Sequence, residues 1–314
     1  MKLLFLFLSL FLLLIAPFFG QIDLDLAKLN NLASMDYTLF FDLRLPRVVT
    51  AFFSGALLGL SGLLFQSLFR NPLSTPFTLG VASGATLGTA FAIVFGFVSF
   101  AAVFGFFGAI ATIIILFAIT SRLQSFSIAT LLLVGIALSF FYSAALMILF
   151  YLSDESQSYE IVRFTMGSLD VVGFKSTLPI IIASLVLLAI AYKFQKELKI
   201  LLTSYDNAFL KGIEVKKVSL LLLLIISIAI GIAVSVVGPI GFVGLIVPHI
   251  LKTLYKQSAD KLLGVTFFYS GIFLVLCDLI ARNLGTSSDI PIGVITSFLG
   301  GPFFIYLLVS RRKN

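Results

Sequence analysis

The sequence predicts an all-α membrane protein with about ten transmembrane helices, and two observations lead to this fold class. Hydrophobic residues make up 60% of the 314 residues and charged residues only 11%, whereas a soluble domain carries about 25% charged residues. The apolar residues also gather in runs close to the roughly 20 residues that a helix needs to cross a bilayer. These runs follow one another without a polar domain between them, so residues 1–314 form a single membrane domain.

Ten apolar stretches are long enough to be considered as spans. They cover residues 3–19, 47–68, 77–96, 99–120, 127–151, 177–194, 218–237, 240–255, 262–282 and 292–309. The stretch 240–255 is short and contains Pro248. The third and fourth stretches are almost contiguous, so the sequence requires a tight turn near Gly96.

The first stretch allows two interpretations. Lys2 followed by an apolar run resembles a signal peptide. However, the run is long, and residues 16–20 (Ala-Pro-Phe-Phe-Gly) are a poor A-x-A cleavage site. We therefore expect an uncleaved first span.

The basic residues predict the orientation of the spans. If the ten spans alternate, one side holds 15 of the 21 basic residues, and the other holds only Lys28, Arg44, Arg47, Arg163, Lys175 and Arg282. The positive-inside rule places the richer side in the cytoplasm, and with it both termini. The net charge of +7 is then explained by loops that flank the membrane. The expected partner is therefore membrane lipid and not nucleic acid.

Glycines recur at a spacing of four residues in two of the stretches. They are Gly55 and Gly59 in the second stretch, and Gly80, Gly84 and Gly88 in the third. Small residues at this spacing let helix backbones approach closely in lipid, so helix packing is the expected role. A pore-lining role is the alternative.

Motifs for catalysis or energy conversion are absent from the sequence. No G-x-x-x-x-G-K-[ST] segment could cradle phosphates. The single histidine, His249, has no Cys, Asp or Glu at a metal-ligand spacing, and no Ser-His-Asp set can be built around it. We therefore expect no catalytic residues, no metal site and no directly bound cofactor.

Asp278 is the one carboxylate well inside a span, and Arg282 follows it at i+4. Residues at this spacing share a helix face, so we expect a structural ion pair near the outer boundary. A proton relay is the alternative, because ionisable residues inside membranes often mark proton pathways.

The segment before the second span reads Leu43-Arg44-Leu45-Pro46-Arg47. It places two cations on the side that should be poor in them. Snorkelling towards lipid phosphates is one explanation, and docking of an acidic partner is the other.

Several motifs together resemble one known family. They are R-L-P-R at 44–47, Q-S-L-F-R-N-P-L-S-T-P at 66–76, L-G-V-A-S-G-A at 79–85, G-P-I-G-F-V-G-L-I-V-P-H at 238–249, C-D-L-I-A-R at 277–282, I-P-I-G-V-I-T at 290–296 and G-G-P-F-F at 300–304. In type, order and spacing this set resembles the FecCD-type permeases, the membrane subunits of bacterial ATP-binding-cassette (ABC) importers for ferric siderophores, haem and vitamin B12. Two departures are Asp289, where the family often has Glu, and a first span that begins almost at Met1, without the N-terminal extension of many relatives.

The resemblance implies a type II ABC importer permease fold with ten spans, in the bacterial inner membrane. It implies a homodimer, or a heterodimer with a paralogous permease, around a central path. Two ATP-binding subunits, which use the ATP, would dock from the cytoplasm. A periplasmic or lipid-anchored substrate-binding protein would dock from outside. The chain itself would be a non-catalytic subunit.

The resemblance also assigns roles to particular residues. Arg44, Arg47 and Arg282 match arginines that resemble docking partners for glutamates of the binding protein. The loop of about 196–217 resembles the coupling helices that contact the ATPase, through Ser204, Asp206, Asn207, Ala208 and Gly212. A solvated basic loop is the alternative for this segment. Residues 166–169 match a family M-G-S-L block near the outer mouth, where a contribution to gating is expected.

Other functions are weaker. A ten-span secondary transporter of the drug/metabolite type would need an ion site, and a single intramembrane carboxylate is a poor basis for one. A membrane-embedded enzyme lacks any metal or nucleophile constellation. Few charges along the path suit a bulky, weakly held chelate rather than a bare ion. The resemblance implies a ferric siderophore as the cargo, because iron chelates are the commonest cargo of the family, and haem and cobalamin stay open.

Overall fold

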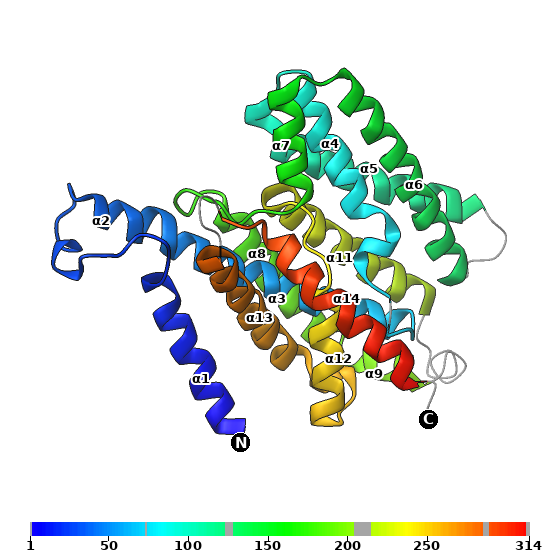
Figure 1. Cartoon of the computed structure of the whole chain (residues 1–314). Helices are drawn as coiled ribbons and strands as arrows, with labels where there is room; N and C mark the ends of the chain where they lie inside the picture. Colours follow the sequence, from blue (N-terminus) through cyan, green and yellow to red (C-terminus); the bar gives the residue numbers. More distant parts are fainter. Residues whose placement is uncertain (1, 73, 123–127, 204–214, 285–288, 312–314) are drawn as a thin grey trace.

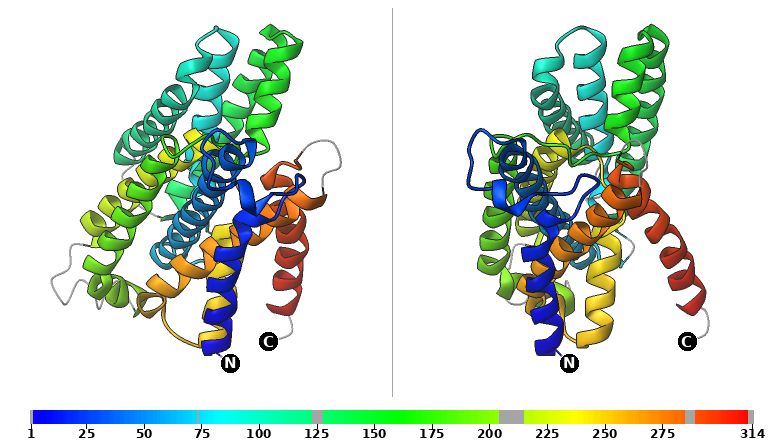
Figure 2. Two further views of the ribbon diagram at one scale, coloured as in Figure 1. Left: turned by 90° about the vertical axis from the view of Figure 1, so that its left-hand side faces the viewer. Right: turned by 60° about the vertical axis from the view of Figure 1, so that its left-hand side comes forward.

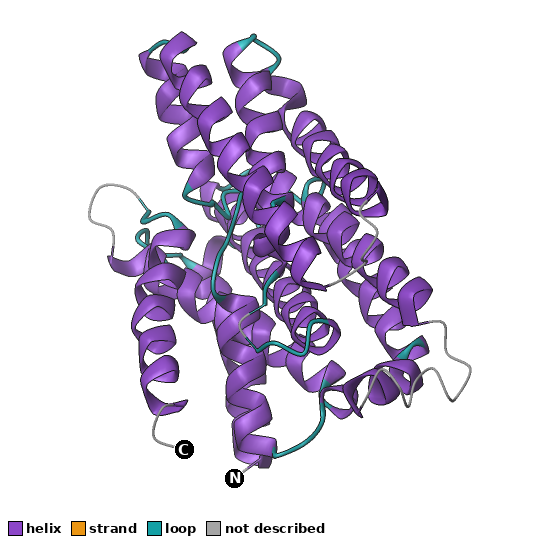
Figure 3. Cartoon of the chain, turned by 90° about the vertical axis from the view of Figure 1, so that its right-hand side faces the viewer, coloured by secondary structure: helices purple, strands orange, loops and turns teal. Residues whose placement is uncertain are grey.

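The computed structural model describes residues 2–72, 74–122, 128–203, 215–284 and 289–311, and these ranges contain helices but no strands (Figure 3). The helices of the apolar stretches are α1 (Lys2–Ile15), α3 (Leu45–Leu68), α4 (Val81–Val94), α5 (Ala101–Arg122), α6 (Ile128–Leu152), α8 (Thr177–Lys193), α11 (Val215–Val237), α12 (Val243–Tyr255), α13 (Leu263–Leu284) and α14 (Ile292–Arg311). Each of the ten predicted stretches therefore contains one helix, and the predicted all-α membrane fold is confirmed.

Not every one of these helices is long and apolar enough for a full span. Within the described residues, five helices are, and five further apolar helical segments of 10–17 residues are not, among them Ile292–Tyr306 of α14. In two of the short ones, α4 and α12, the stretch begins with irregular backbone. The stretch at 77–96 opens with the 3-10 turn η4 (Pro76–Leu79) and left-handed Gly80, with φ +77°. The stretch at 240–255 reaches helical geometry only after Phe242, with φ +66°. Such irregular backbone is tolerated at membrane depth where protein buries it.

The predicted tight turn near Gly96 is present. Gly96 has φ +79° between the end of α4 and the short 3-10 turn η5 (Val98–Phe100). A left-handed conformation costs glycine little because it has no Cβ. The turn makes α4 and α5 an antiparallel pair.

Two elements outside the apolar stretches lie at the end of the bundle that the basic residues predict to be outside, here called the outer end. The helix α2 (Met35–Thr38) and the π-helical segment η3 (Leu39–Arg44) extend α3 beyond the bundle, so that the continuous helical run covers Met35–Leu68. The helix α7 (Glu155–Thr165) is amphipathic and begins with a capping box in which Asp154 and Gln157 exchange hydrogen bonds. At the other end, α9 (Gln195–Thr203) follows α8.

The predicted glycine motifs lie at helix crossings. A Cβ added to Gly59 would lie 1.8 Å from Ser270 Oγ on α13, and one added to Gly55 would lie 2.4 Å from the Ser270 carbonyl oxygen. On α4, a Cβ at Gly84 would lie 1.9 Å from Thr112 Oγ1, and one at Gly88 would lie 2.3 Å from the Phe104 carbonyl, both on α5. These distances leave room only for glycine, which is the geometry that close packing of helices requires.

Gly80 is different from the other four. It caps α4 in the left-handed region, and a Cβ there would be 3.0 Å from the Gly135 carbonyl oxygen on α6. Its glycine is explained by backbone conformation as well as by space.

The bundle is built around α3, which is buried along most of its length between α13, α12 and α8. A second group, α4 to α7, stands beside it (Figure 1). The start of α1 and the end of α14 lie at the same end of the molecule (Figures 1 and 2). A chain with an even number of spans has both of its ends on the same side of the membrane, as this arrangement requires.

Candidate functional site

The outer end of the bundle contains a cluster of ion pairs centred on Arg47, in the first turn of α3. Its Nε lies 2.9 Å from Asp278 Oδ1 on α13. Its Nη1 lies 2.8 Å from Asp170 Oδ1, in the loop between α7 and α8, and 2.5 Å from Asp289 Oδ2, just before α14. One guanidinium thus joins segments that are 123 to 242 residues away in the chain.

The two edges of the Arg47 guanidinium have different surroundings. Asp278, on the Nε side, has a fully buried side chain, whereas Asp170 and Asp289, on the Nη1 side, have side chains that are 37% and 31% exposed. Ion pairs at exposed positions contribute little to stability, but loss of a partner from a buried pair leaves a costly unpaired charge. The Asp278 contact is therefore an anchor, and the Nη1 contacts are weaker.

The predicted pair within α13 is present. Arg282 Nε lies 3.0 Å from Asp278 Oδ2, and both side chains are buried. Asp278 is thus held between two arginines, which supports a structural role for it. The i, i+4 spacing revealed Arg282, but no local signal pointed to Arg47.

Arg282 and Arg44 hold the end of the first helical segment. Arg282 donates to the carbonyl oxygens of Phe19 (3.2 Å) and Ala16 (3.4 Å), and Arg44 donates to those of Phe18 (3.1 Å) and Ile22. The last carbonyl groups of a helix have no partner within the helix, and the dipole there favours cations. The two arginines therefore cap α1 and its 3-10 extension η1 (Ala16–Phe18) from α13 and from the η3–α3 junction.

Pro46 explains how the α7–α8 loop attaches to the extended helix. Proline has no N–H, so the carbonyl group of Asp42, four residues earlier, has no α-helical donor at that position. The N–H of Gly173 donates to this carbonyl oxygen at 2.7 Å. Gly173 itself has φ +64°, which glycine adopts readily.

The same loop is tied to α11 and α14 by its backbone. Ser168 N donates to Val237 O (2.9 Å), at the end of α11. Ile292 N and Gly293 N, in the first turn of α14, donate to Gly167 O (3.2 Å) and Met166 O (3.0 Å). The M-G-S-L block of the sequence is therefore the segment onto which the outer end of α14 docks.

Asp170 is the polar centre of this loop. Its Oδ2 accepts a hydrogen bond from Ser168 Oγ (2.7 Å) and pairs with Arg163 Nη2 (2.6 Å), at the end of α7. Burial disfavours the carboxylate, but the Ser168 hydrogen bond and the positive charges of Arg47 and Arg163 outweigh it, so the pKa of Asp170 lies below its ordinary value.

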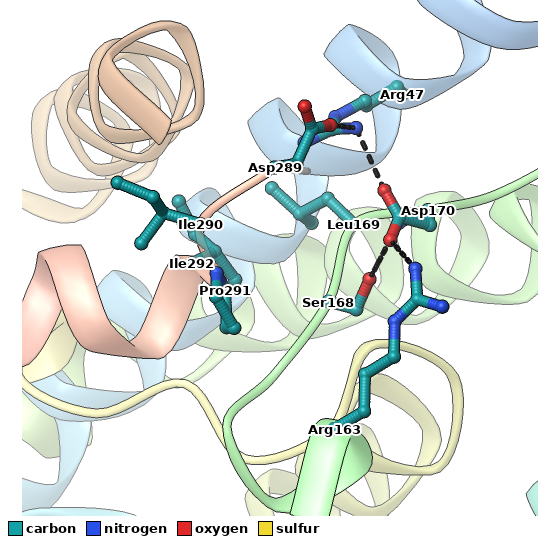
Figure 4. A pocket seen from close by; sticks show the side chains of 9 residues that line it. All are labelled: Arg47, Arg163, Ser168, Leu169, Asp170, Asp289, Ile290, Pro291 and Ile292. Carbon is teal, nitrogen blue, oxygen red and sulfur yellow. Dashed lines mark hydrogen bonds and ion pairs between the residues drawn. The ribbon is translucent and has the colours of Figure 1, made fainter. Parts of the chain in front are cut away.

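Around these residues the surface forms a small polar recess (Figure 4). Its lining residues are Arg47, Arg163, Ser168, Leu169, Asp170, Asp289, Ile290, Pro291 and Ile292. Arg163 and Ser168 point towards Asp170 from one side, and Asp289 and Arg47 face it from the other. The recess thus lies between the α7–α8 loop and the segment that leads into α14.

The described residues contain no group of three or more His, Cys, Asp or Glu side chains that could hold a metal ion. The ring of His249 packs edge-to-face against Phe303 on α14, with centroids 6.1 Å apart. The carboxylates of the outer cluster all face arginines. This chemistry suits ion pairing between segments, and no residue set for bond-making chemistry accompanies it in the described part of the chain.

The three arginines expected to dock a binding protein all lie at this outer end, but they have partners within the chain. Arg44 and Arg282 are buried, and the Arg47 side chain is only 14% exposed. Docking by these residues stays a prediction. The expected coupling residues Ser204, Asp206, Asn207, Ala208 and Gly212 lie outside the described residues.

At the opposite end, which is the predicted inner end, the described residues bring α3 and α12 together through polar contacts. Lys252 Nζ donates to Gln66 Oε1 (3.0 Å), and Gln66 Nε2 donates to the Gly244 carbonyl oxygen (3.1 Å). Nearby, Gln195 on α9 donates to the Asp260 carbonyl oxygen (2.7 Å). Sequence reasoning identified none of these contacts, because each joins residues far apart in the chain.

Known membrane proteins are similar to this chain over nearly its whole length. The hemin transport system permease protein HmuU of Yersinia pestis is 33% identical over 308 residues, which cover 94% of this chain and 91% of that protein. The molybdate import system permease protein MolB of Haemophilus influenzae is 31% identical, with coverage of 95% and 89%. The vitamin B12 import system permease protein BtuC of Vibrio vulnificus is 34% identical, with coverage of 92% and 88%.

A solved structure shares the fold over almost the whole chain. It is described as an inward-facing conformation of a metal-chelate type ABC transporter, and it matches with a TM-score of 0.84 and 30% identity, covering 97% of this chain and 98% of that one. The family model described as the FecCD transport family matches residues 6–310. This chain is therefore an α-helical membrane protein that belongs to the FecCD transport family.

Proposed function

We propose that this chain is the permease subunit of an ABC importer and that it carries a metal chelate, with a ferric siderophore as the first candidate. The observation that carries the proposal is the family match over residues 6–310, supported by relatives that are named permeases over nearly their whole length. The sequence has no P-loop, so ATP hydrolysis belongs to a separate subunit.

The choice of cargo depends on less specific features. The relatives are named for hemin, vitamin B12 and molybdate, so the family accepts cargoes of different chemistry. A path lined by helices with few charges favours a bulky chelate that is held weakly over a bare ion. A ferric siderophore leads because it is the commonest cargo of the permeases that the sequence resembles, and haem and cobalamin follow.

The proposed assembly is a permease dimer with two ATP-binding subunits at the inner end and a substrate-binding protein at the outer end. The proposed contacts are the loop at 204–212 for the ATPase, and Arg44, Arg47 and Arg282 for the binding protein. The internal carboxylates of Asp170 and Asp289 already contact Arg47 Nη1, so a docking glutamate would compete with them.

The similarity to an inward-facing transporter supports a conformational assignment. With a TM-score of 0.84 to that structure, we propose that the described conformation is also inward-facing. Its outer end, where the Arg47 cluster lies, is then the closed end.

Reconstitution tests the proposed function. The chain is placed in liposomes with the ATPase subunit and the binding protein encoded beside it, and uptake of a radiolabelled ferric siderophore, haem, cobalamin and molybdate is measured. We expect uptake of one chelate that requires ATP and the binding protein. Uptake driven by a proton gradient without the ATPase would instead support the secondary-transporter alternative.

A further inference from the structure

Arg47 Nη1 is shared by two carboxylates from separate segments of the outer end. Asp170 belongs to the α7–α8 loop and Asp289 to the segment that leads into α14, and both lie within 2.8 Å of this one nitrogen. The opposite edge of the guanidinium is anchored to buried Asp278, which Arg282 also contacts. Arg47 is therefore a bridge with one fixed side and one side that faces the recess (Figure 4).

The helix that this bridge restrains is loosely attached elsewhere. Among the described residues, α14 packs mainly against α12 and α13, and several of its large apolar side chains are exposed, including Phe298 and Tyr306. Its outer end is held by Asp289 and by the two backbone hydrogen bonds to Met166 and Gly167. The right-hand view of Figure 2 shows α14 in red, leading away from the other helices towards the C-terminus.

We propose that Arg47 is a positioning residue that closes the outer end: its Nη1 bridges Asp170 to Asp289, holds the start of α14 against the α7–α8 loop, and releases this bridge when the outer end opens. This inference rests on the proposed function, because only a transporter needs the outer end to open.

The chemistry of the two sides decides which contact opens. The Asp170 and Asp289 carboxylates are partly exposed, so water replaces Arg47 at little cost. Asp278 is fully buried between two arginines, so separating it from them would leave an unpaired charge in an apolar setting. Arg47 therefore stays paired with Asp278 of α13, while its contact with Asp289, at the start of α14, separates.

Thiol labelling tests this bridge without any cargo. Ile292 lines the recess and is only 2% exposed, so a cysteine there reports opening. The native Cys277 is first replaced by Ala, and I292C is then labelled with a membrane-impermeant maleimide in cells. We expect the maleimide to label I292C several-fold faster in the D289N background than in the parent. Asp42 is also an exposed carboxylate on the outer side, and D42N is the matched control, expected to label at the parent rate.

A cross-link tests whether opening is needed for transport. Asp170 and Asp289 contact the same nitrogen, so D170C and D289C, introduced after C277A, can be joined by a short bis-methanethiosulfonate cross-linker. In the reconstituted importer, we expect the cross-linker to stop chelate uptake by the double variant and reduction to restore it, while uptake by each single cysteine variant responds to neither treatment.

The outcomes separate this inference from the proposed function. Equal labelling of I292C in the D289N and D42N backgrounds, or full uptake by the cross-linked double variant, would overturn the bridge while the importer stands. If the parent takes up no chelate with ATP, the proposed function fails. Faster labelling of I292C in the D289N background, but not in the D42N background, would then still show that Arg47 and Asp289 hold the outer end closed.

Discussion

At the scale of single residues, the outer end depends on how many charges are buried and on which of them are matched. Asp278 has no exposure, and the two arginines beside it approach within 2.9 and 3.0 Å. A buried carboxylate between two guanidiniums is tolerated because its charge is compensated on both sides. Removal of either arginine should therefore matter more than removal of a cation at the surface.

We predict that R47Q destabilises the protein by about 3–5 kcal/mol, because it leaves buried Asp278 short of one partner. The double variant R47Q/D278N should be less stable still, because it leaves the buried Arg282 guanidinium without its carboxylate partner. Thermal unfolding in detergent measures both. R163Q is the control: Arg163 is 55% exposed, so its loss should cost at most about 1 kcal/mol. Equal losses for R47Q and R163Q would contradict the prediction.

Asp170 should make part of the stability depend on pH. Its pKa in the folded protein lies below the ordinary value of 3.8, so its charged form is stabilised on folding. That contribution is present at neutral pH and is lost as the pH falls through the lowered pKa. We predict that D170N is less stable than the parent at pH 7 and that the two converge only as the pH falls below about 4. A melting series from neutral to acid pH checks this, and a constant difference would refute it.

At the scale of elements, the helices approach as closely as their small residues allow. The crossing of α3 and α13 places Ser270 against Gly59, and the pairing of α4 and α5 places Thr112 against Gly84. Lipid supplies no hydrophobic drive between helices, so such close van der Waals contact is what holds them together. These contacts are reciprocal, and a compensating change can test them.

We predict that G59A destabilises the α3–α13 crossing by about 1–3 kcal/mol, the usual cost of overpacking. The new Cβ would lie 1.8 Å from Ser270 Oγ and 2.2 Å from Ser270 Cβ. G59A/S270G should recover stability, because the second change removes both atoms. A Cβ added to Gly301 on α14 would meet no described atom within 4 Å, so G301A is the tolerated control. Melting temperatures of the purified variants measure these effects. If S270G does not restore the stability of G59A, residues 59 and 270 are not in direct contact.

At the scale of the whole molecule, charge is divided between the two ends. If the ten predicted spans alternate, the predicted inner side carries 15 basic and 4 acidic residues, a net +11, and the predicted outer side carries 6 basic and 10 acidic residues, a net −4. Positive charge resists transfer across the membrane, so this division supports cytoplasmic termini.

Reporter fusions test this orientation. We predict that a cytoplasm-dependent fluorescent protein fused after residue 313 is bright, and that alkaline phosphatase fused there is inactive. The same two reporters placed after Lys175, in the outer loop, should give the opposite result. Active phosphatase after residue 313 would invert the topology, and with it the assignment of inner and outer ends.

Much of the fold was predictable from the sequence because the bilayer constrains it. A span needs a long apolar run, so the ten stretches each contain a helix, and Gly96 marks the turn between two of them. Breaks within a stretch were less predictable. Phe242 has a left-handed backbone conformation, so α12 begins only at Val243. Phe rarely adopts this conformation, so the sequence does not predict it.

Hydropathy and helical spacing are local properties, so the order of residues was enough to predict the spans, their alternation and the Asp278–Arg282 pair. The folded chain was needed to show that Arg47 binds three carboxylates up to 242 residues away and that Arg44 and Arg282 cap the end of the first helical segment. Those partners belong to different helices, and their meeting depends on how the helices cross. A single guanidinium has five donors, and only the crossing of the helices determines which acceptors come within reach of them.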